Sequence, residues 1–151
     1  YIHACSYLES DTEPLSPSAV GPLFTVLSCA LPRLPRFVVR KTIDRVYDIV
    51  VRTLMNDSAV SAAGLVSGLK FAGDLLSVRD SINWDDSASL FTTLLGFLTD
   101  SRPEVRMQSC ASIRDVLQSF QGTSSFLSFA SEGIYNSFQR FLPLESRSQK
   151  G

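Results

Sequence analysis

Residues that could carry out acid-base or covalent chemistry are few in this chain and are not spaced for it. The single histidine, His3, lies near the amino terminus in a polar stretch, so no Ser-His-Asp or Cys-His constellation can form inside a fold. The adjacent acids Asp85 and Asp86 point to different faces of a helix, and helix capping explains them better than a general acid/base pair. We therefore expect no enzymatic activity, no cofactor, no metal and no small-molecule substrate.

The segment 64–70, with two glycines and a lysine, superficially resembles a phosphate-binding loop. It has one residue too few between the glycines and one too many before Lys70, and no Ser or Thr follows the lysine. It also lies in the middle of an expected helix, where Gly64, Gly68 and Gly73 each cost about 1 kcal/mol relative to alanine. We interpret these glycines as small residues that let neighbouring helices pack closely.

The three cysteines, Cys5, Cys29 and Cys110, are far apart, odd in number and not in Cys-x-x-Cys spacing. This excludes both a disulfide framework and a cysteine zinc site. Cys29 and Cys110 fall on apolar helix faces, so we expect both to be buried, inert thiols. Free thiols are typical of a reducing compartment, nuclear or cytosolic.

Positive charge is concentrated between residues 32 and 52, where six basic residues and two acids give a net charge of +4. A basic face there could bind RNA phosphates or an acidic partner. Alternatively, Arg40–Asp44 and Asp48–Arg52 are four-apart ion pairs on a solvated helix face. The acidic isoelectric point and the absence of interleaved aromatic residues favour this second interpretation. The candidate basic face consists of Arg33, Arg36, Arg40, Lys41, Arg45 and Arg52.

With 151 residues, 44% hydrophobic, the chain can form one compact domain or about three stacked repeats. No long uninterrupted apolar run indicates a membrane span, and no secretory signal is visible. The chain lacks an initiator methionine and begins in mid-pattern, so we expect a fragment of a longer protein. We expect a polar arm or linker over residues 1–15, a helical-repeat segment over 16–142 and a polar tail over 143–151.

Apolar residues recur every three or four positions over most of the chain, which is typical of helices that bury one face. Between residues 36 and 54 this spacing outweighs the strand propensity of the many β-branched side chains. A later helix is expected to bury Cys110. The last one is expected to bury Leu127, Ala130, Ile134, Phe138 and Phe141. The helices are expected near residues 18–31, 36–54, 58–76, 86–98, 103–120 and 124–141.

A short phrase occurs twice, first as residues 56–60 and again as residues 100–106. Its aspartates are 43 residues apart (100 − 57) and its valines 45 apart (105 − 60), within the roughly 40–47-residue period of HEAT and armadillo units. In each copy the polar residues should cap a helix, with Pro103 at a first helical position, and Arg106 should pair with an acid of a neighbouring repeat. The sequence therefore predicts an all-α solenoid of about six helices, which is a binding scaffold. The motif residues are Asp57, Val60, Asp100, Pro103, Val105 and Arg106.

Three stretches, residues 31–41, 100–106 and 113–122, resemble the amino-terminal HEAT region of the ribosomal RNA-processing protein twelve-like family. The run Val-Leu-Gln-Ser-Phe-Gln-Gly over 116–122 is the most particular of them and is most similar to plant members; the similarity covers residues 20–142. The resemblance implies a nuclear and nucleolar scaffold that associates with pre-ribosomal particles and assembly factors and helps them mature and leave the nucleus. It also implies contacts with a Ran-type GTPase and karyopherins.

A generic protein-interaction solenoid, such as a transport receptor or a regulatory subunit, is the alternative function. The two functions differ in whether the protein sediments with pre-ribosomal particles. Apart from the basic face, the exposed candidate for binding is Trp84, which we expect in a loop, although a loop tryptophan more often covers helix ends than binds a partner.

Overall fold

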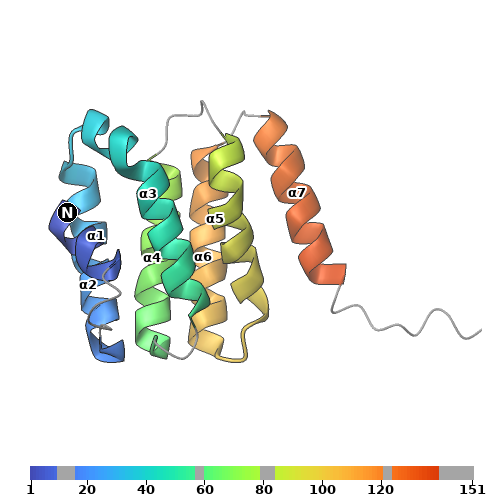
Figure 1. Ribbon diagram of the computed structural model, residues 1–151. Coiled ribbons are helices and arrows are strands. Elements are labelled where there is room, and N and C mark those ends of the chain that lie inside the picture. Colours follow the sequence, from blue (N-terminus) through green and yellow to red (C-terminus); the bar gives the residue numbers. More distant parts are fainter. Residues whose placement is uncertain (10–15, 57–59, 79–83, 121–123, 140–151) are drawn as a thin grey trace, which may run out of the picture.

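The computed structural model of the chain describes residues 1–9, 16–56, 60–78, 84–120 and 124–139 (Figure 1). These residues form α-helices and two short 3₁₀ turns, and none of them lies in a strand. The predicted all-α solenoid is thus confirmed. The helices are α1 (Ile2–Glu9), α2 (Pro17–Ala30), α3 (Arg36–Met55), α4 (Ala62–Ser77), α5 (Trp84–Gly96), α6 (Pro103–Ser119) and α7 (Ser124–Gln139), with 3₁₀ turns η1 (Leu31–Arg33) and η2 (Phe97–Thr99).

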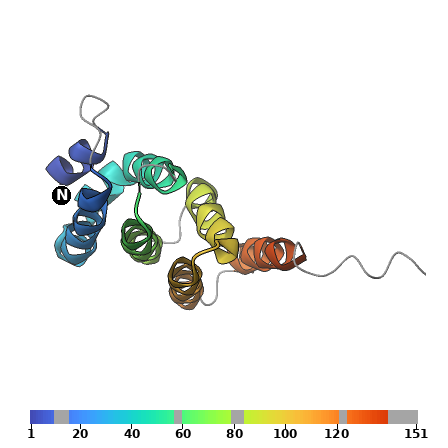
Figure 2. The ribbon, with the colours of Figure 1, turned by 90° about the horizontal axis from the view of Figure 1, so that it is seen from below.

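The helices stack in two layers, which Figure 2 shows end-on. One layer, here called the even layer, contains α2, α4 and α6, and α4 contacts both of its neighbours. The other, the odd layer, contains α1, α3, α5 and α7, in which α3 contacts α1 and α5, and α5 contacts α7. Successive helices alternate between the layers, and each apolar stripe is covered by neighbours in its own layer and in the other one.

The buried face of α3 is the one that its apolar spacing predicts. Val39, Ile43, Val46, Tyr47, Val50 and Leu54 are each at most 8% exposed. They recur at three- and four-residue steps, so they lie on one side of the helix and reach the core together. The charged residues of α3 are all exposed.

Small residues bring the even-layer helices close together, as the glycines of segment 64–73 predict. A β-carbon added to Gly21 would lie 3.3 Å from the Cα of Gly64, where α2 meets α4. A β-carbon added to Gly73 would lie 2.8 Å from the Cβ of Ser112, where α4 meets α6. Side chains larger than hydrogen at Gly73 would therefore force the two helices apart.

Two buried serines of α6 donate hydrogen bonds to helix backbone carbonyls. The Ser112 hydroxyl donates to the Leu69 carbonyl oxygen of α4 at 2.9 Å, and the Ser109 hydroxyl donates to the Leu94 carbonyl oxygen of α5 at 2.6 Å. These bonds satisfy hydroxyls that burial would otherwise make unfavourable. They also fix α6 against both layers.

The prediction of a polar arm over residues 1–15 is wrong for its first part, which forms α1. Cys5 is 5% exposed, and Tyr1, Ala4 and Leu8 pack against the core. The apolar residues of this eight-residue helix are too few to give a recognisable period. Residues 10–15, and the tail expected over 143–151, lie outside the described residues.

The helix expected over 58–76 begins later, at Ala62. Its cap is Ser61, whose hydroxyl oxygen accepts the backbone N–H of Gly64 at 3.1 Å. The expected caps, Asp57 and Ser58, lie outside the described residues. Trp84 is the first residue of α5, so the prediction that it lies in a loop is wrong.

Both cysteines expected in the core, Cys29 and Cys110, are exposed, whereas Cys5 is buried. Cys29 and Cys110 lie on apolar faces of α2 and α6, and each of these faces is wider than the side of the helix that contacts other helices. Each of these helices has an even-layer neighbour in α4 alone, so part of its apolar surface stays open.

The last helix, α7, buries only part of the face predicted for it. Ala130 is 1% exposed and Ile134 packs against the core, as predicted, but Leu127 and Phe138, also expected inward, are 41% and 60% exposed. The expected Phe141 lies outside the described residues. Phe126, which was not expected inward, is fully buried. The reason is its contact with α5, where the Phe126 ring meets Phe91 edge-on at a centroid distance of 5.7 Å. The phenylalanine contact therefore decides the orientation of α7.

Candidate functional site

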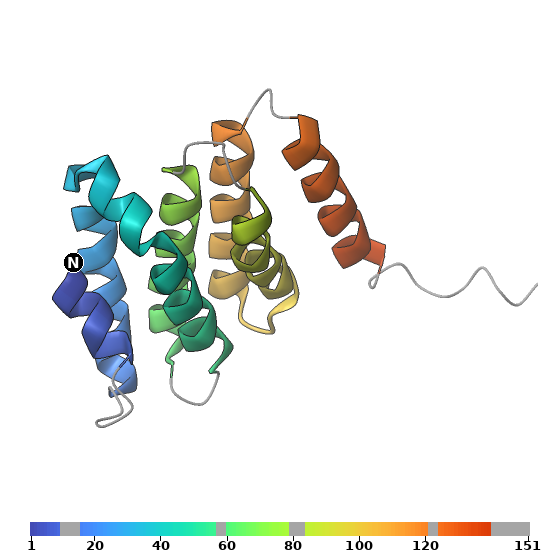
Figure 3. The same cartoon turned by 45° about the horizontal axis from the view of Figure 1, so that its top comes forward.

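All six residues of the predicted basic face are exposed. Arg33 belongs to η1 and the other five to α3, a helix of the odd layer that runs obliquely in Figure 3. Arg36 and Arg45 are nine positions apart, which places them on opposite edges of a helix with 3.6 residues per turn. The six residues therefore do not form one continuous stripe.

Two smaller groups replace the single basic face. Lys41, Arg45 and Arg52 have the spacing of one helix edge, hereafter the Lys41 edge, and Arg36 and Arg40 lie toward the other edge. The exposed acids Asp44 and Asp48 lie between the two groups. Negative charge in the middle of the surface weakens its attraction for phosphates.

Two four-apart ion pairs are predicted on this helix. In the one between Asp48 and Arg52, the Arg52 Nε donates to the backbone carbonyl oxygen of Asp48, at 3.4 Å. The pair of Arg40 with Asp44 stays a prediction. Elsewhere in the described chain, Lys70 pairs with Asp74, Arg102 with Asp100 and Arg114 with Asp115.

The motif residue Asp100 is the centre of a turn that leads into α6. Its carboxylate accepts hydrogen bonds from the backbone N–H and Nε of Arg102, both at 2.8 Å, and from its Nη2 at 2.7 Å. The Arg102 side-chain bond is the main cause that lowers the pKa of the Asp100 carboxyl below its usual value. This geometry fixes the turn and indicates a structural role.

The neighbouring Arg106 also serves this turn. Its Nη1 donates to the carbonyl oxygens of Asp100 at 2.7 Å and Ser101 at 2.9 Å. The prediction that Arg106 pairs with an acid of another repeat is therefore wrong. The guanidinium satisfies carbonyls of its own repeat, which are near in sequence.

The two copies of the repeated phrase do not occupy equivalent positions. The buried residues Leu69, Ala72 and Leu76 of α4 match Ile113, Val116 and Phe120 of α6 at an offset of 44 residues (113 − 69). At that offset Val60 matches Glu104, not Val105. Val60 precedes α4, whereas Val105 is inside α6, which begins at Pro103 as predicted.

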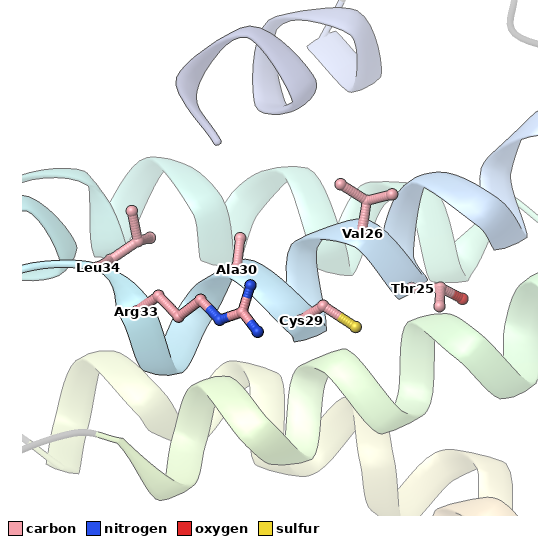
Figure 4. A pocket seen from close by; sticks show the side chains of 6 residues that line it. All are labelled: Thr25, Val26, Cys29, Ala30, Arg33 and Leu34. Carbon is pink, nitrogen blue, oxygen red and sulfur yellow. The ribbon is translucent and has the colours of Figure 1, made fainter.

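The sequence did not predict the shallow apolar groove that lies on α2. Its volume is about 410 Å³, and Figure 4 shows the Arg33 guanidinium lying beside Ala30 and Cys29. Val26 is 59% exposed there. The available signal was that α2 has no charged residue and more apolar positions than one face can hold. The groove, hereafter the α2 groove, is lined by Thr25, Val26, Cys29, Ala30, Arg33 and Leu34.

A second depression, of about 430 Å³, lies where the carboxyl-terminal parts of α3 and α5 meet. Met55, 67% exposed, and three threonines, Thr92, Thr93 and Thr99, contribute to its lining. Asp100 also lines it, but its carboxylate is engaged by Arg102.

The described residues contain no group of three or more His, Cys, Asp or Glu side chains that could hold a metal ion. In the same part of the chain, no helix has both the length and the apolar character needed to cross a membrane. His3 lies on the exposed side of α1. What the described part of the chain offers is surfaces for binding.

Comparison with known proteins gives one match. No curated protein and no solved structure matches the chain. The family model described as RRP12-like, N-terminal HEAT repeats, matches residues 1–151. The match agrees with the resemblance carried by the three stretches between residues 31 and 122, and it extends over α1. The chain belongs to the RRP12-like family, in its N-terminal HEAT-repeat region.

Proposed function

We propose that this chain is a non-catalytic scaffold segment that acts in ribosome biogenesis. Its roles are in rRNA processing and in the maturation and nuclear export of pre-ribosomal subunits. The family match over residues 1–151 carries the proposal, and the two-layer helical stack supports it, because such stacks present extended surfaces to partners. The expected locations are the nucleus and nucleolus, with shuttling to the cytoplasm.

The proposed partners are pre-ribosomal particles and their assembly factors, together with a Ran-type GTPase and karyopherins. Direct rRNA contact belongs to the Lys41 edge of α3, where three exposed basic residues share one side of the helix. Asp44 and Asp48 limit this contact, so we expect protein partners to supply most of the affinity.

The test of the scaffold role is affinity purification of the tagged full-length protein from cells at moderate salt. We expect precursor rRNA and assembly factors to be recovered with it. Recovery of transport receptors or unrelated proteins, without pre-ribosomal material, would replace this function by the generic interaction module. The interleaved acids of α3 are the observation that favours that alternative.

RNA contact by α3 is tested separately with the double variant Lys41→Glu and Arg52→Glu. We expect it to lower recovery of precursor rRNA and to flatten its salt dependence, since each lost phosphate contact reduces the log-log slope by roughly 0.7–0.9. The matched control, Lys70→Glu with Arg114→Glu, makes the same change of charge on α4 and α6. Equal recovery from both variants would show that the Lys41 edge does not bind RNA.

A further inference from the structure

The outward side of α3 presents two large apolar side chains to solvent. Phe37 is 66% exposed and Met55 is 67% exposed. They share one side of the helix with Asp44 and Asp48, because steps of seven, four and seven residues keep all four within roughly 40° of one another at 3.6 residues per turn. This row, hereafter the α3 line, is about 27 Å long at 1.5 Å per residue. It has an apolar side chain at each end and two exposed carboxylates between them.

The α3 line lies in the middle of the odd layer and not at an end of the stack. Helix α3 contacts α1 on one side and α5 on the other, and Figure 2 shows both neighbours beside it. Further repeats of a longer chain would extend the layers at their ends, so they would leave the outward side of α3 in solvent. An occupant of this side therefore lies outside the row of stacked helices.

The depression beside Met55 can hold an apolar side chain of such an occupant. Its volume is about 430 Å³, and Leu54, Met55 and Phe97 contribute to its lining. It is open on the α5 side, because a β-carbon added to Gly96 would meet no atom within 4 Å. Asp100, which also lines it, has its carboxylate held by Arg102. The exposed residues between positions 87 and 99 are small and uncharged: Ser89, Thr92, Gly96 and Thr99.

A second copy of the chain is a poor occupant of the α3 line. The four positions are symmetric around Val46, so two antiparallel copies of α3 would place Phe37 against Met55 but also Asp44 against Asp48. A parallel arrangement would place each aspartate against itself. In both cases carboxylates face carboxylates at the centre of the contact, which is unfavourable where water is excluded. The centre of the line therefore selects for positive charge in the occupant.

Charges beside the line restrict the occupant further. Tyr47, whose hydroxyl lies 3.3 Å from that of Ser87 in α5, marks the α5 side of α3. The Lys41 edge lies on the other side of the line, and Arg40 lies on the α5 side near the Phe37 end. Bases of the occupant are therefore favoured over the two aspartates alone, and acids are favoured beside the Lys41 edge. A helix can present these two charges on adjacent sides.

We propose that the outward side of α3 binds a helix of a partner protein that carries lysine or arginine between two apolar anchors. One anchor lies in the depression beside Met55 and the other lies on Phe37, and the bases between them meet Asp44 and Asp48. This binding needs neither RNA nor a pre-ribosomal particle, so it stands independently of the proposed scaffold function.

The test uses the purified chain and a displayed library of helices of about 20 residues, the length of α3, with variable apolar and charged positions. We expect selection to enrich peptides with lysine or arginine between two apolar residues. A selected peptide, labelled for fluorescence anisotropy, should bind Met55→Ala on the order of tenfold more weakly, because the exposed methionine buries its side chain in the contact. Met107→Ala, at a 74% exposed position of α6, is the matched control and should bind normally.

Two further changes test the depression and the carboxylates. Gly96→Leu places a side chain in the space that the apolar anchor needs, so it should weaken binding about tenfold, and Gly96→Ala should weaken it less. Asp48→Lys should weaken binding of the selected peptide about fivefold and strengthen binding of the same peptide with glutamates in place of its bases. Asp115→Lys, at a side chain of α6 that is 60% exposed, is its control.

Selection of no helices, or of helices indifferent to Met55→Ala and Gly96→Leu, overturns the proposal. Selection of acidic peptides whose binding Asp48→Lys leaves unchanged also overturns it, because such peptides bind a basic surface elsewhere. A dimer of the chain that Met55→Ala dissociates overturns it in favour of a second copy as occupant. Circular dichroism of each variant confirms that the fold is retained.

Discussion

At Gly73 the space for a side chain is taken by α6. A β-carbon there would lie 2.8 Å from the Ser112 Cβ and 3.2 Å from its Cα, whereas one at Gly96 would meet no atom within 4 Å. We expect Gly73→Ala to lower the free energy of unfolding by about 1–3 kcal/mol, because displacing α6 outweighs the better helix propensity of alanine. Gly96→Ala should instead raise it by about 0.5–1 kcal/mol. Urea unfolding measures both, and equal effects would show that α4 and α6 are not held this closely.

A second residue with a measurable effect is Asp100, whose hydrogen bonds from Arg102 lower the pKa of its carboxyl. Because the folded-state pKa lies below the unfolded value of about 3.9, its stabilising contribution is present above that pH and is lost as pH falls through the folded-state pKa. We expect Asp100→Asn to lower the free energy of unfolding by about 1–3 kcal/mol at pH 7.

The difference between the wild type and Asp100→Asn should shrink as the pH falls below about 4. Chemical denaturation at a series of pH values measures it. Asp115→Asn is the control, since the Asp115 side chain is 60% exposed and its pair with Arg114 is long, at 3.4 Å. A difference that stays constant down to pH 2 would contradict the role assigned to the Asp100 carboxylate.

At the scale of the element, the packing of α1 on the core can be measured through the reactivity of the Cys5 thiol. Cys5 lies on the buried side of α1, whereas Cys29 and Cys110 are exposed on α2 and α6. We expect a colorimetric thiol reagent to modify two cysteines at once and the third slowly, at a rate set by local opening of α1. Cys29→Ser and Cys110→Ser should each remove one fast equivalent and leave stability unchanged. Cys5→Ser should cost about 1–3 kcal/mol, because it buries a hydroxyl. Three fast thiols would mean that α1 does not hold Cys5 against the core.

The apolar spacing in the sequence predicted the buried side of a helix where that spacing continues over many residues. It did not predict the buried side where this depends on which helices lie next to it in the stack. The period of α3 runs over 20 residues, so its buried face could be predicted. In α1 the period is too short to recognise. In α7 the aromatic contact of Phe126 with Phe91 turns Phe126 inward and leaves Leu127 exposed, while Ala130 is buried as predicted. Whether an apolar flank is covered depends on which helix lies next to it, and spacing alone does not contain this information.

The same limit applies to the candidate sites. The charges of α3 were predictable as an exposed surface, but their division into two edges follows from helix geometry with Asp44 and Asp48 between them. The α2 groove was missed because Val26 and Cys29 look like core residues in a helix without charges. They became recognisable as a surface only when α2 was placed at the end of its layer.

On the scale of the whole molecule, a stack in which each helix touches near neighbours should not unfold uniformly. Helix α4 contacts helices on several sides, namely α2, α3, α5 and α6, whereas α7 packs mainly on α5, through Phe126 and Phe129. Hydrogen exchange read by mass spectrometry should therefore show the slowest amides in α4 and faster ones in α7.

The spread of a local defect distinguishes a stack from a single cooperative unit. Phe126→Ala removes a ring that is fully buried against Phe91 and Phe120, at a local cost of about 3–5 kcal/mol. We expect it to accelerate exchange in α7 and leave α2 unchanged, because the two lie far apart along the stack (Figure 1). Leu127→Ala, at a position 41% exposed, should alter neither. If Phe126→Ala accelerated α2 and α7 alike, the described helices would unfold as one body.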